Sequence, residues 1–594
     1  MKNKIYQYIC IAFLLAALPS CQDFLEISDK GSVSPKIFPS TMEQVNLMLT
    51  ASYAGSHTKG LYTFYWFPMG IYLYDKTSNL DATYDLRGTQ LNNNTDLDCE
   101  YNTQTYSDIF RWVELSNAAL EAIDQYWNDD LPDTQKEELN YMKGQALFNR
   151  ALAYWHGQIY FEIDPNGWGL PLFNKVPKTI EEMMAPRATT KDSWDFIIQT
   201  LKEAIPHLIG KTDPTRATEW AAKGLLAKVY MQAGYKAEAQ ALLEEIITKS
   251  GKKLVPFTVY SAMFYGDPAN EFNEETLYEI DMSINEKQNG PWAGYTTGSG
   301  MPMVFAPWPL NLKFRDKPSD TEFDIITNAT GGWGNNYIHD ANIRRFGFTL
   351  GPPPVKRVKN PNFDSRAERS IDNLPYILDP VYHQASIDER ANTDPRLSMC
   401  AAQPYVDTFL DDMGRPTYYD KSPGLNQFPQ IMAWNHKKFT NLLGYENQKN
   451  FSSDANYPIV RLADIYLLYA EVVKDTDPAK ALEYINKVHR RAYNYPVDAP
   501  SPVDYKSLNG RTKAAPEDHL ANDVLKYERW AELFAEGQWW FDIRRWKIGE
   551  QEVKYYKEAR NGPLSFRSDD YYVQPIPKTE VERYNGKIEQ SGNY

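Results

Sequence analysis

Three glutamates recur at every fourth position near the C-terminus of this chain: Glu528, Glu532 and Glu536, within "ERWAELFAEGQWWFDIRRW". On an α-helix, residues four apart lie on nearly one face, with Cβ atoms about 5–6 Å apart. A retaining glycosidase holds its two catalytic carboxyl groups about 5–5.5 Å apart. The spacing therefore raises one chemical hypothesis, acid/base catalysis on a sugar by Glu532 and Glu536. The alternative is that these glutamates stabilise the fold.

Other catalytic signals are absent from the sequence. The eight histidines include no H-E-x-x-H pair, and there is no Walker loop and no G-x-S-x-G elbow. Lys and Arg number 63 against 78 Asp and Glu, so the formal charge is -15, and no basic patch is segregated. We therefore expect no cofactor and no nucleic-acid partner. The sequence leaves open a structural calcium ion or a metal bound by distant carboxylates.

The first 20 residues are typical of a secretory signal. Two lysines precede an unbroken apolar stretch at 9–18, which is too short to span a hydrocarbon core of ~30 Å. The stretch ends in "LPSC", which resembles the cleavage site of bacterial lipoproteins, although Pro19 departs from the usual pattern. We expect removal of residues 1–20, acylation of Cys21 and a lipidated polar tether at 21–40. An ordinary secretory signal is the alternative.

Two further cysteines, Cys99 and Cys400, lie 301 positions apart. Two distant cysteines do not make a disulfide framework. We expect both to be free, buried thiols, with a disulfide between them as the alternative. No later run reaches 18 apolar residues, so we predict no other segment that spans a membrane.

Helical periodicity dominates both ends of the chain. The segment centred on Gly234 fits the frame of a tetratricopeptide helix pair, with the glycine at the turn. A similar unit occupies 461–492, where Asp477 and Pro478 supply an N-cap and a first-turn residue. The 528–546 segment is expected to close the stack as one helix. Such units cannot bury their apolar faces alone, so we predict a mainly α, tetratricopeptide-like helical superhelix.

The middle of the chain differs in composition. Proline, glycine and asparagine are frequent there, helical periodicity is rare, and aromatic clusters such as "GPWAGYTTGSGMPMVFAPWPL" and "GGWGNNY" occur. Long ordered loops of this kind are usually functional. We predict a single domain over 41–594, in which a helical scaffold at about 41–254 and 456–594 carries a large loop-rich, ligand-binding insertion subdomain at about 255–455.

Seven segments, taken in order, resemble the SusD/RagB family of surface nutrient-binding lipoproteins of Bacteroidota. They are "CQDFLE", "SDIFRWVELSNAAL", "DPRLSM", "PIVRLADIYLLYAEVV", "ALEYINKVHRRA", the 528–546 segment and "YYVQPIPKTEV". The resemblance covers essentially all of the mature chain and is carried by the order of the segments. It implies the SusD-like fold, a tetratricopeptide-like superhelix with a variable, loop-rich insertion.

The resemblance also implies a function. Family members lie on the outer membrane as lids over a TonB-dependent, SusC-like transporter, capture oligosaccharides or peptides, and are not enzymes. We therefore expect a non-catalytic surface protein, lipid-anchored at Cys21, that binds an oligosaccharide or polysaccharide and delivers it to a SusC-like transporter. Two alternatives stay open: a RagB-like peptide binder, against which the aromatic content argues, and a surface glycoside hydrolase.

In the family, the glutamate-rich segment is a structural signature. We therefore expect its glutamates to pair with Arg529, Arg544 and Arg545 and with helix N-termini, because Glu–Arg pairs on packed helices are common. Gly537 interrupts the helical pattern, and the three tryptophans that follow it are expected to fill a core. On this interpretation the segment is scaffold.

A sugar ring presents an apolar face and a rim of hydroxyl groups, so its binder needs flat aromatic platforms beside polar side chains. The resemblance places the ligand site in the insertion and in the loop after the first helix. Candidates in the insertion are Trp292, Tyr295, Trp308, Trp333, Asn335, Asn336 and Tyr337. Candidates in the loop are Trp66, Tyr74, Asp81, Tyr84 and Arg87. The alternative role for each is local core of the subdomain.

Overall fold

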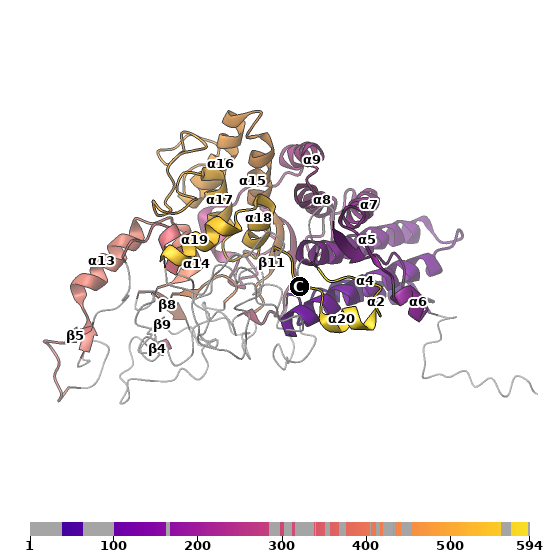
Figure 1. Cartoon of the computed structure of the whole chain (residues 1–594), viewed down its shortest axis with the longest axis horizontal. Helices are drawn as coiled ribbons and strands as arrows, with labels where there is room; N and C mark the ends of the chain where they lie inside the picture. The colour runs from indigo at the N-terminus through magenta and orange to yellow at the C-terminus, as the bar shows by residue number, and fades with distance from the viewer. Residues whose placement is uncertain are drawn as a thin grey trace, which may run out of the picture.

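A computed structural model gives the structure of the chain. It is mainly α-helical, as predicted, with short two- and three-stranded sheets between the helices (Figure 1). The residues that the structure describes are 38–62, 100–161, 167–283, 298–301, 312–314, 338, 340–350, 357–367, 376–403, 406–410, 416–419, 432, 434–440, 453–559 and 572–591. No helix among them combines the length and the apolar character needed to cross a bilayer.

The N-terminal part is a stack in which each long helix packs mainly on its neighbour along the chain. Its elements are α2 (Met42–Ala54), α4 (Glu100–Tyr126), α5 (Asp133–Phe161), β1 (Trp168–Pro171), α6 (Ile180–Met183), β2 (Arg187–Thr189), α7 (Thr190–Leu208), α8 (Glu219–Ala233) and α9 (Lys236–Lys249). Helix α2 packs on α4, α4 on α5, α5 on α7, α7 on α8 and α8 on α9. Nearest-neighbour packing of this kind is that of a tetratricopeptide-like solenoid.

The stack continues in the C-terminal part of the chain. Its elements are α15 (Leu462–Val473), α16 (Pro478–Ala492), α17 (Val524–Glu532), α18 (Trp539–Trp546), α19 (Gly549–Ala559) and α20 (Lys578–Arg583). Helix α9 packs on α15, which in turn packs on α16 and α17, so the two parts join into one superhelix (Figure 1). The predicted helical scaffold is therefore confirmed.

Local sequence signals set the helix ends. Thr218 caps α8 by accepting a hydrogen bond from a first-turn amide, and Gly234 ends the helix in the left-handed conformation at φ 83°. Asp477 caps α16 by accepting a hydrogen bond from Lys480 N, and Pro478 stands in the first turn. Both the predicted turn and the predicted cap are confirmed.

The middle of the chain holds short elements. They are α10 (Phe257–Ala262), β3 (Thr276–Ile280), β4 (Leu312–Phe314), α12 (Asp340–Arg345), β5 (Arg357–Lys359), β6 (Tyr376–Leu378), α13 (Pro380–Ala391), α14 (Arg396–Cys400), β7 (Ala401–Ala402), β8 (Thr408–Leu410), β9 (Pro416–Tyr419), β10 (Asn435–His436) and β11 (Tyr457–Arg461). Strand β1 pairs with β2, β10 with β7, β5 with β6, and β9 with both β4 and β8.

Strands β3 and β11 form an antiparallel pair that we call the stem. It runs from the pair Ile280–Tyr457 at one end to the pair Thr276–Arg461 at the other, and every residue of both strands is buried. The stem encloses residues 281–456, compared with the predicted 255–455. Helix α10, which precedes the stem, contributes to the main hydrophobic core.

The segment at 528–546 is not the single helix that was predicted. Between α17 and α18, Ala535 and Gly537 have φ of 62° and 72°, in the left-handed region that ends a right-handed helix. The predicted interruption at Gly537 is thus confirmed, but it separates two helices. Consequently Glu536 does not lie on the helical face that carries Glu532.

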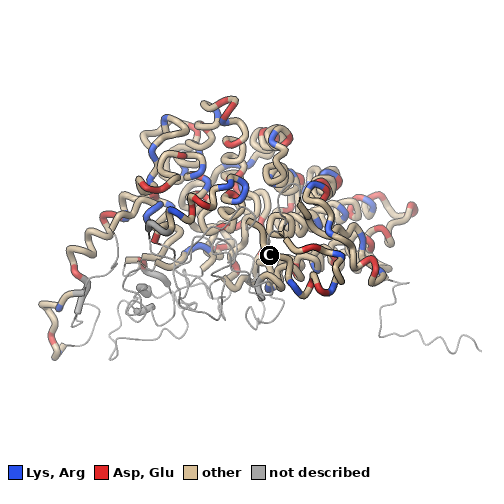
Figure 2. The backbone as a smooth tube through the Cα atoms, in the orientation of Figure 1, with Lys and Arg blue, Asp and Glu red and all other residues tan. Residues whose placement is uncertain are grey.

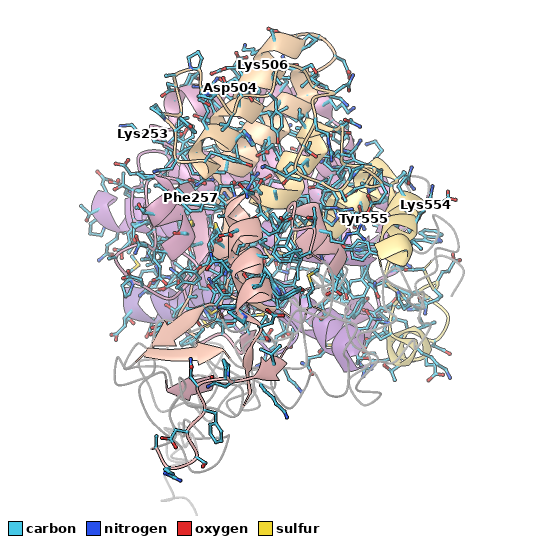
Figure 3. The ribbon with its side chains drawn as sticks, turned by 90° about the vertical axis from the view of Figure 1, so that its left-hand side faces the viewer. Lys253, Phe257, Asp504, Lys506, Lys554 and Tyr555 are labelled. Atoms are coloured by element: carbon cyan, nitrogen blue, oxygen red, sulfur yellow. The ribbon has the colours of Figure 1, made fainter. Side chains whose placement is uncertain are left out.

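The tryptophans after this turn fill the core, as predicted. Trp539 and Trp540 are buried, and Trp546 is partly buried against the same cluster. In Figure 3, Phe257 of α10 and Tyr555 of α19 lie toward opposite sides of the body, with side chains filling the space between them. These aromatic rings belong to the scaffold.

Cys400 is a free, buried thiol, as predicted. Burial raises its pKa to about 11, so it stays protonated and unreactive at neutral pH. Cys99 and the expected lipid-bearing Cys21 lie outside the described residues.

Candidate functional site

The glutamates that raised the catalytic hypothesis are buried among arginines. Arg461, at the end of β11, donates hydrogen bonds from Nη1 to Glu275 at 2.9 Å and to Glu532 at 2.6 Å. Its Nε and Nη2 reach the two carboxylate oxygens of Glu536, each at 2.8 Å. All four side chains are at most 3% exposed. Arg461 thus neutralises carboxylates from both sides of the insertion.

Two further arginines extend this arrangement. Arg491 of α16 pairs with Glu275 at 2.9 Å and with Glu532. Arg396 of α14 holds Glu528 through two hydrogen bonds of 2.8 and 3.0 Å. We call this set the ion network, defined as Glu275, Arg396, Arg461, Arg491, Glu528, Glu532 and Glu536. Figure 2 shows acidic and basic residues interspersed along the surrounding helices as well.

The electrostatics of the ion network oppose proton transfer. Burial by itself would raise the pKa of Glu532, because a charge is costly to desolvate. The three arginines outweigh burial and hold the pKa of Glu532 at about 2. Burial is likewise outweighed at Glu528, where Arg396 and His489 hold the pKa at about 2. A general acid needs a pKa near the working pH, so these carboxylates are suited to structural ion pairs.

The partners of these glutamates differ from those predicted. Arg529 and Arg545 instead share Asp542, at 2.9 and 2.8 Å. Arg544 donates to a backbone carbonyl of α5. The arginines that bind the glutamates lie 132, 71 and 41 positions away along the chain. The predicted pairing with neighbouring arginines was wrong, because the partners of these buried glutamates come from elements that are distant in the sequence and adjacent only in the folded chain.

We predict that Glu532→Gln lowers the free energy of unfolding by about 3–5 kcal/mol, because it leaves the buried Arg461, Arg491 and Arg396 undercompensated. Urea unfolding followed by circular dichroism measures this change. Glu550→Gln, at an exposed position of α19, is the matched control and should change stability by less than about 0.5 kcal/mol. Unchanged stability in Glu532→Gln, with sugar release by the wild type alone, would instead support catalysis.

The residues predicted to bind ligand lie outside the described residues. This holds for Trp66, Tyr74, Asp81, Tyr84, Arg87, Trp292, Tyr295, Trp308, Trp333, Asn335, Asn336 and Tyr337. Their role stays a prediction. The described residues on either side of these candidates show where the segments that contain the candidates join the scaffold.

The segment that carries the first group leaves and re-enters the scaffold at one place. Gly60 N donates to Asp108 Oδ2 at 2.7 Å, and Thr105 Oγ1 donates to Gly60 O at 2.8 Å. A Cβ at position 60 would lie 2.5 Å from Gln104 O, so this close approach requires glycine. Gly60, just before 63–99, is thereby held against the first turns of α4, the helix that begins just after that segment.

The turn at 56–62 also contacts both strands of the stem. His57 Nε2 lies 2.7 Å from the backbone oxygen of Asp281, the first residue after β3. The ring of Tyr62 packs on the ring of Tyr457, the first residue of β11, with centroids 5.2 Å apart. The turn at 56–62, which precedes the first group of candidates, therefore lies beside both ends of the insertion.

A second part of the insertion is tied to the same place. Ser299 and Ser453 exchange two backbone hydrogen bonds of 2.7 Å. The hydroxyl groups of Ser299 and Tyr457 are also hydrogen-bonded to each other. We call this region the neck, defined as residues 56–62, 281–283, 298–301 and 453–457.

The neck is anchored to helix α5 through a histidine. The Tyr62 hydroxyl lies 2.6 Å from His156 Nε2, and His156 Nδ1 lies 2.6 Å from Leu152 O. Because a carbonyl oxygen only accepts, Nδ1 carries the proton and Nε2 accepts from the tyrosine. Burial lowers the pKa of His156 to about 3, so the ring stays neutral in this tautomer.

The candidates at 333–337 also precede a fixed point. Ile338 is buried, and its N donates to Trp434 O at 2.8 Å. Two residues later, Asp340 Oδ1 accepts from Met432 N at 3.0 Å. The end of this cluster is therefore held against the returning chain of the insertion.

Sequence reasoning identified none of the neck residues. His156 lies in helix α5 without a second histidine nearby, and Tyr457 lies in a short buried strand. Ser299 stands in a glycine-rich segment. No local pattern joins them, since their contacts span more than 90 positions along the chain.

A buried carboxylate, Glu279, and a half-buried one, Glu271, lie beside the neck and face one asparagine. Glu279 Oε2 accepts from Asn456 Nδ2 at 3.0 Å, and Glu271 Oε1 accepts from Asn456 N at 3.3 Å. Burial first, and then the charge of Glu279, raises the pKa of Glu271 to about 8. Nowhere in the described part of the chain do three or more His, Cys, Asp or Glu residues gather in a group that could hold a metal ion.

We predict that Glu271 makes stability depend on pH. Its folded-state pKa lies above the ordinary 4.5, so its contribution is fully present below pH 4.5 and is lost as pH rises through 8. Glu271→Gln, which keeps the group neutral, should become more stable than the wild type by on the order of 3 kcal/mol at pH 9.

Urea unfolding between pH 5 and 9 measures this difference. Glu274→Gln, exposed in the same turn, is the control and should follow the wild type at every pH. A stability difference between Glu271→Gln and the wild type that does not grow with pH would contradict the prediction.

Two family models match the chain, "SusD family" over 378–594 and "Starch-binding associating with outer membrane" over 23–231, which together cover more than half of it. The SusD-like protein P25 of Formosa agariphila is 23% identical over 98% of this chain and 97% of its own length. The chain belongs to the SusD-like family.

Solved structures share the fold. A SusD-like protein of Bacteroides fragilis has a TM-score of 0.66 at 18% identity, over 94% of this chain and 99% of that one. Surface glycan-binding protein A of Bacteroides thetaiotaomicron, solved in complex with laminarihexaose, has a TM-score of 0.59 at 15% identity, over 93% of this chain and 100% of that one. The tetratricopeptide-like superhelix seen here is thus the SusD-like fold.

Proposed function

We propose that this protein is a non-catalytic surface binder that holds an oligosaccharide or polysaccharide and delivers it to a TonB-dependent, SusC-like transporter. The observation that carries the proposal is the convergence at the neck. Both segments that contain the predicted aromatic platforms are rooted there, through Gly60, Tyr62 and Ser299. The related fold of a glycan-binding protein that holds laminarihexaose supports carbohydrate as the ligand class.

The energetics of such a site suit capture and release. An exposed tryptophan that buries about a third of its surface against a sugar contributes about 1–2 kcal/mol. Three platforms supply about 3–6 kcal/mol before the cost of immobilising the ligand. Dissociation constants in the millimolar to micromolar range follow. A transport lid needs affinity of this order, since it must release what it captures.

The absence of catalysis is part of the proposal. Arg461 pairs with both Glu532 and Glu536 in the ion network, and Lys438, a buried lysine outside it, donates to Glu536 at 2.8 Å, which supports a structural role for both glutamates. A bound glycan would therefore leave the protein uncut. A surface hydrolase would need another pair of carboxyl groups.

We predict that Trp292→Ala, Trp308→Ala and Trp333→Ala each weaken glycan binding about tenfold, because each removes one stacking platform. Affinity electrophoresis in gels that contain laminarin, and then starch and xylan, measures retention. Thermal unfolding should not change. Trp168→Ala, a tryptophan 39% exposed on β1 of the scaffold, is the matched control and should be retained like the wild type.

Unchanged retention of all three variants, in a gel that retards the wild type, would reject this site. Mass spectrometry of ligand that co-purifies with the protein separates glycan from peptide. A co-purified peptide, with no retention by any polysaccharide, would favour the RagB-like alternative.

We also propose that the protein is held at the outer membrane by acylation of Cys21. One matching family model is described as associating with the outer membrane, which supports this location. Its match begins at residue 23, two residues after Cys21. Each buried acyl CH₂ contributes about 0.8 kcal/mol, so several chains anchor a protein stably.

We predict that Cys21→Ala abolishes acylation and moves the protein from the membrane fraction to the soluble fraction. Metabolic labelling with a palmitate analogue and fractionation of cells measure the two effects. Cys400→Ala, which removes a buried thiol far along the chain, is the control and should stay in the membrane fraction. Labelling that persists in Cys21→Ala would contradict the anchor.

A further inference from the structure

The neck contains a continuous path of buried contacts between the insertion and helix α5. We infer that Tyr457 and Tyr62 are positioning residues for the ligand site proposed above, on which this inference rests. Together they hold the 298–301 segment and the 56–62 turn in a fixed relation. The segments that carry the two groups of candidate platforms join the described chain at these two places.

Tyr457 lies at the centre of the path. Its ring stacks on Phe439, with centroids 4.7 Å apart and planes inclined by 26°, and packs on Tyr62 on another side. Its hydroxyl is hydrogen-bonded to Ser299, whose Oγ also accepts from Met301 N at 3.2 Å. Tyr457 and Ser299 are fully buried, and burial raises the pKa of the Tyr457 hydroxyl well above its ordinary value. The hydroxyl therefore keeps its proton and its hydrogen bond.

Tyr62 fixes the other end of the path. Its hydroxyl donates to the neutral His156, whose tautomer is set by the carbonyl of Leu152 one turn earlier on α5. The rings of Tyr62 and His156 are nearly perpendicular, at 88°, with centroids 5.4 Å apart. The tyrosine ring is therefore held both by packing and by a directed hydrogen bond.

The contacts of Tyr62 and Ser299 lie next in the chain to the segments that carry the candidate platforms. Tyr62 is followed at once by the 63–99 segment, and Ser299 stands between the candidates Tyr295 and Trp308. A ligand that touches platforms of both segments gains binding free energy from both only when the distance between those platforms matches the ligand. Contacts that preset this spacing lower the ordering cost of binding without touching the ligand.

The experiment compares Tyr457→Phe, Ser299→Ala and the double variant. Both single changes remove the hydrogen bond between the two hydroxyl groups and keep the surrounding rings, and Ser299→Ala also removes the acceptor of Met301 N. We expect each to weaken retention in polysaccharide gels about three- to tenfold, as loss of one hydrogen bond allows. The double variant should bind the polysaccharide no more weakly than the single variant that binds less well, because the shared hydrogen bond can be removed only once. The midpoint of thermal unfolding should move little.

A matched control is Tyr469→Phe. Tyr469 is a buried tyrosine of α15 whose hydroxyl is hydrogen-bonded to Glu244 of α9, and neither residue belongs to the neck. This variant should be retained like the wild type. Equal weakening of binding in Tyr469→Phe and Tyr457→Phe would overturn the inference.

A second readout needs no ligand. Hydrogen exchange followed by mass spectrometry should show faster exchange in both the 56–62 and 298–301 peptides of Tyr457→Phe, with α7 and α8 unchanged. Faster exchange in neither or in only one of the two peptides would overturn the inference. Wild-type protein that no polysaccharide retains would count against the proposed function, while the exchange result would still decide whether the two segments are coupled.

Discussion

The burial of Arg461 is the constraint on which the rest of the structure depends. An unpaired guanidinium inside a protein costs several kcal/mol, so this side chain can be buried only with its carboxylates in place. Those carboxylates come from Glu275, just before β3, and from Glu532 and Glu536 near the C-terminus. The strand that leads out of the insertion, the segment that leads into it and the last helices must therefore assemble together.

The stem connects the buried Arg461 to the neck. Arg461 is the last residue of β11 and Tyr457 is the first, and β11 is paired with β3 along its length. The end at Arg461 is fixed by charge, whereas the end at Tyr457 is fixed by aromatic packing and by hydroxyl groups. A short, fully buried strand pair has little freedom to bend between them. The segments that begin and end at the neck thus join the scaffold at a strand pair that is fixed at both ends.

What could be predicted from the sequence was what local signals determine. The caps at Asp477 and Gly234, the helical stack and the buried thiol of Cys400 follow from short patterns and composition. The left-handed turn at Ala535 does not, because alanine gives no sign of it. The glutamates' partners and the neck depend on contacts between distant positions, which a single sequence does not reveal. For the ligand site, the sequence supplies candidate residues that stay a prediction, and the structure adds the places where the segments that carry them join the scaffold.

The family matches suggest why the constraint and the ligand segments are kept apart. They cover 23–231 and 378–594, and the interval between them contains the second group of candidates, from Trp292 to Tyr337. Of the ion network, only Glu275 lies in that interval, and it stands at the root of the stem. Buried charges tolerate few substitutions, since losing one partner strands the others. The interval also supplies Arg345, which is fully buried between Asp518 and Glu552, so its charged residues are constrained as well. A change of an uncharged aromatic residue there removes none of these ion pairs, so the same superhelix can tolerate different aromatic residues in that interval.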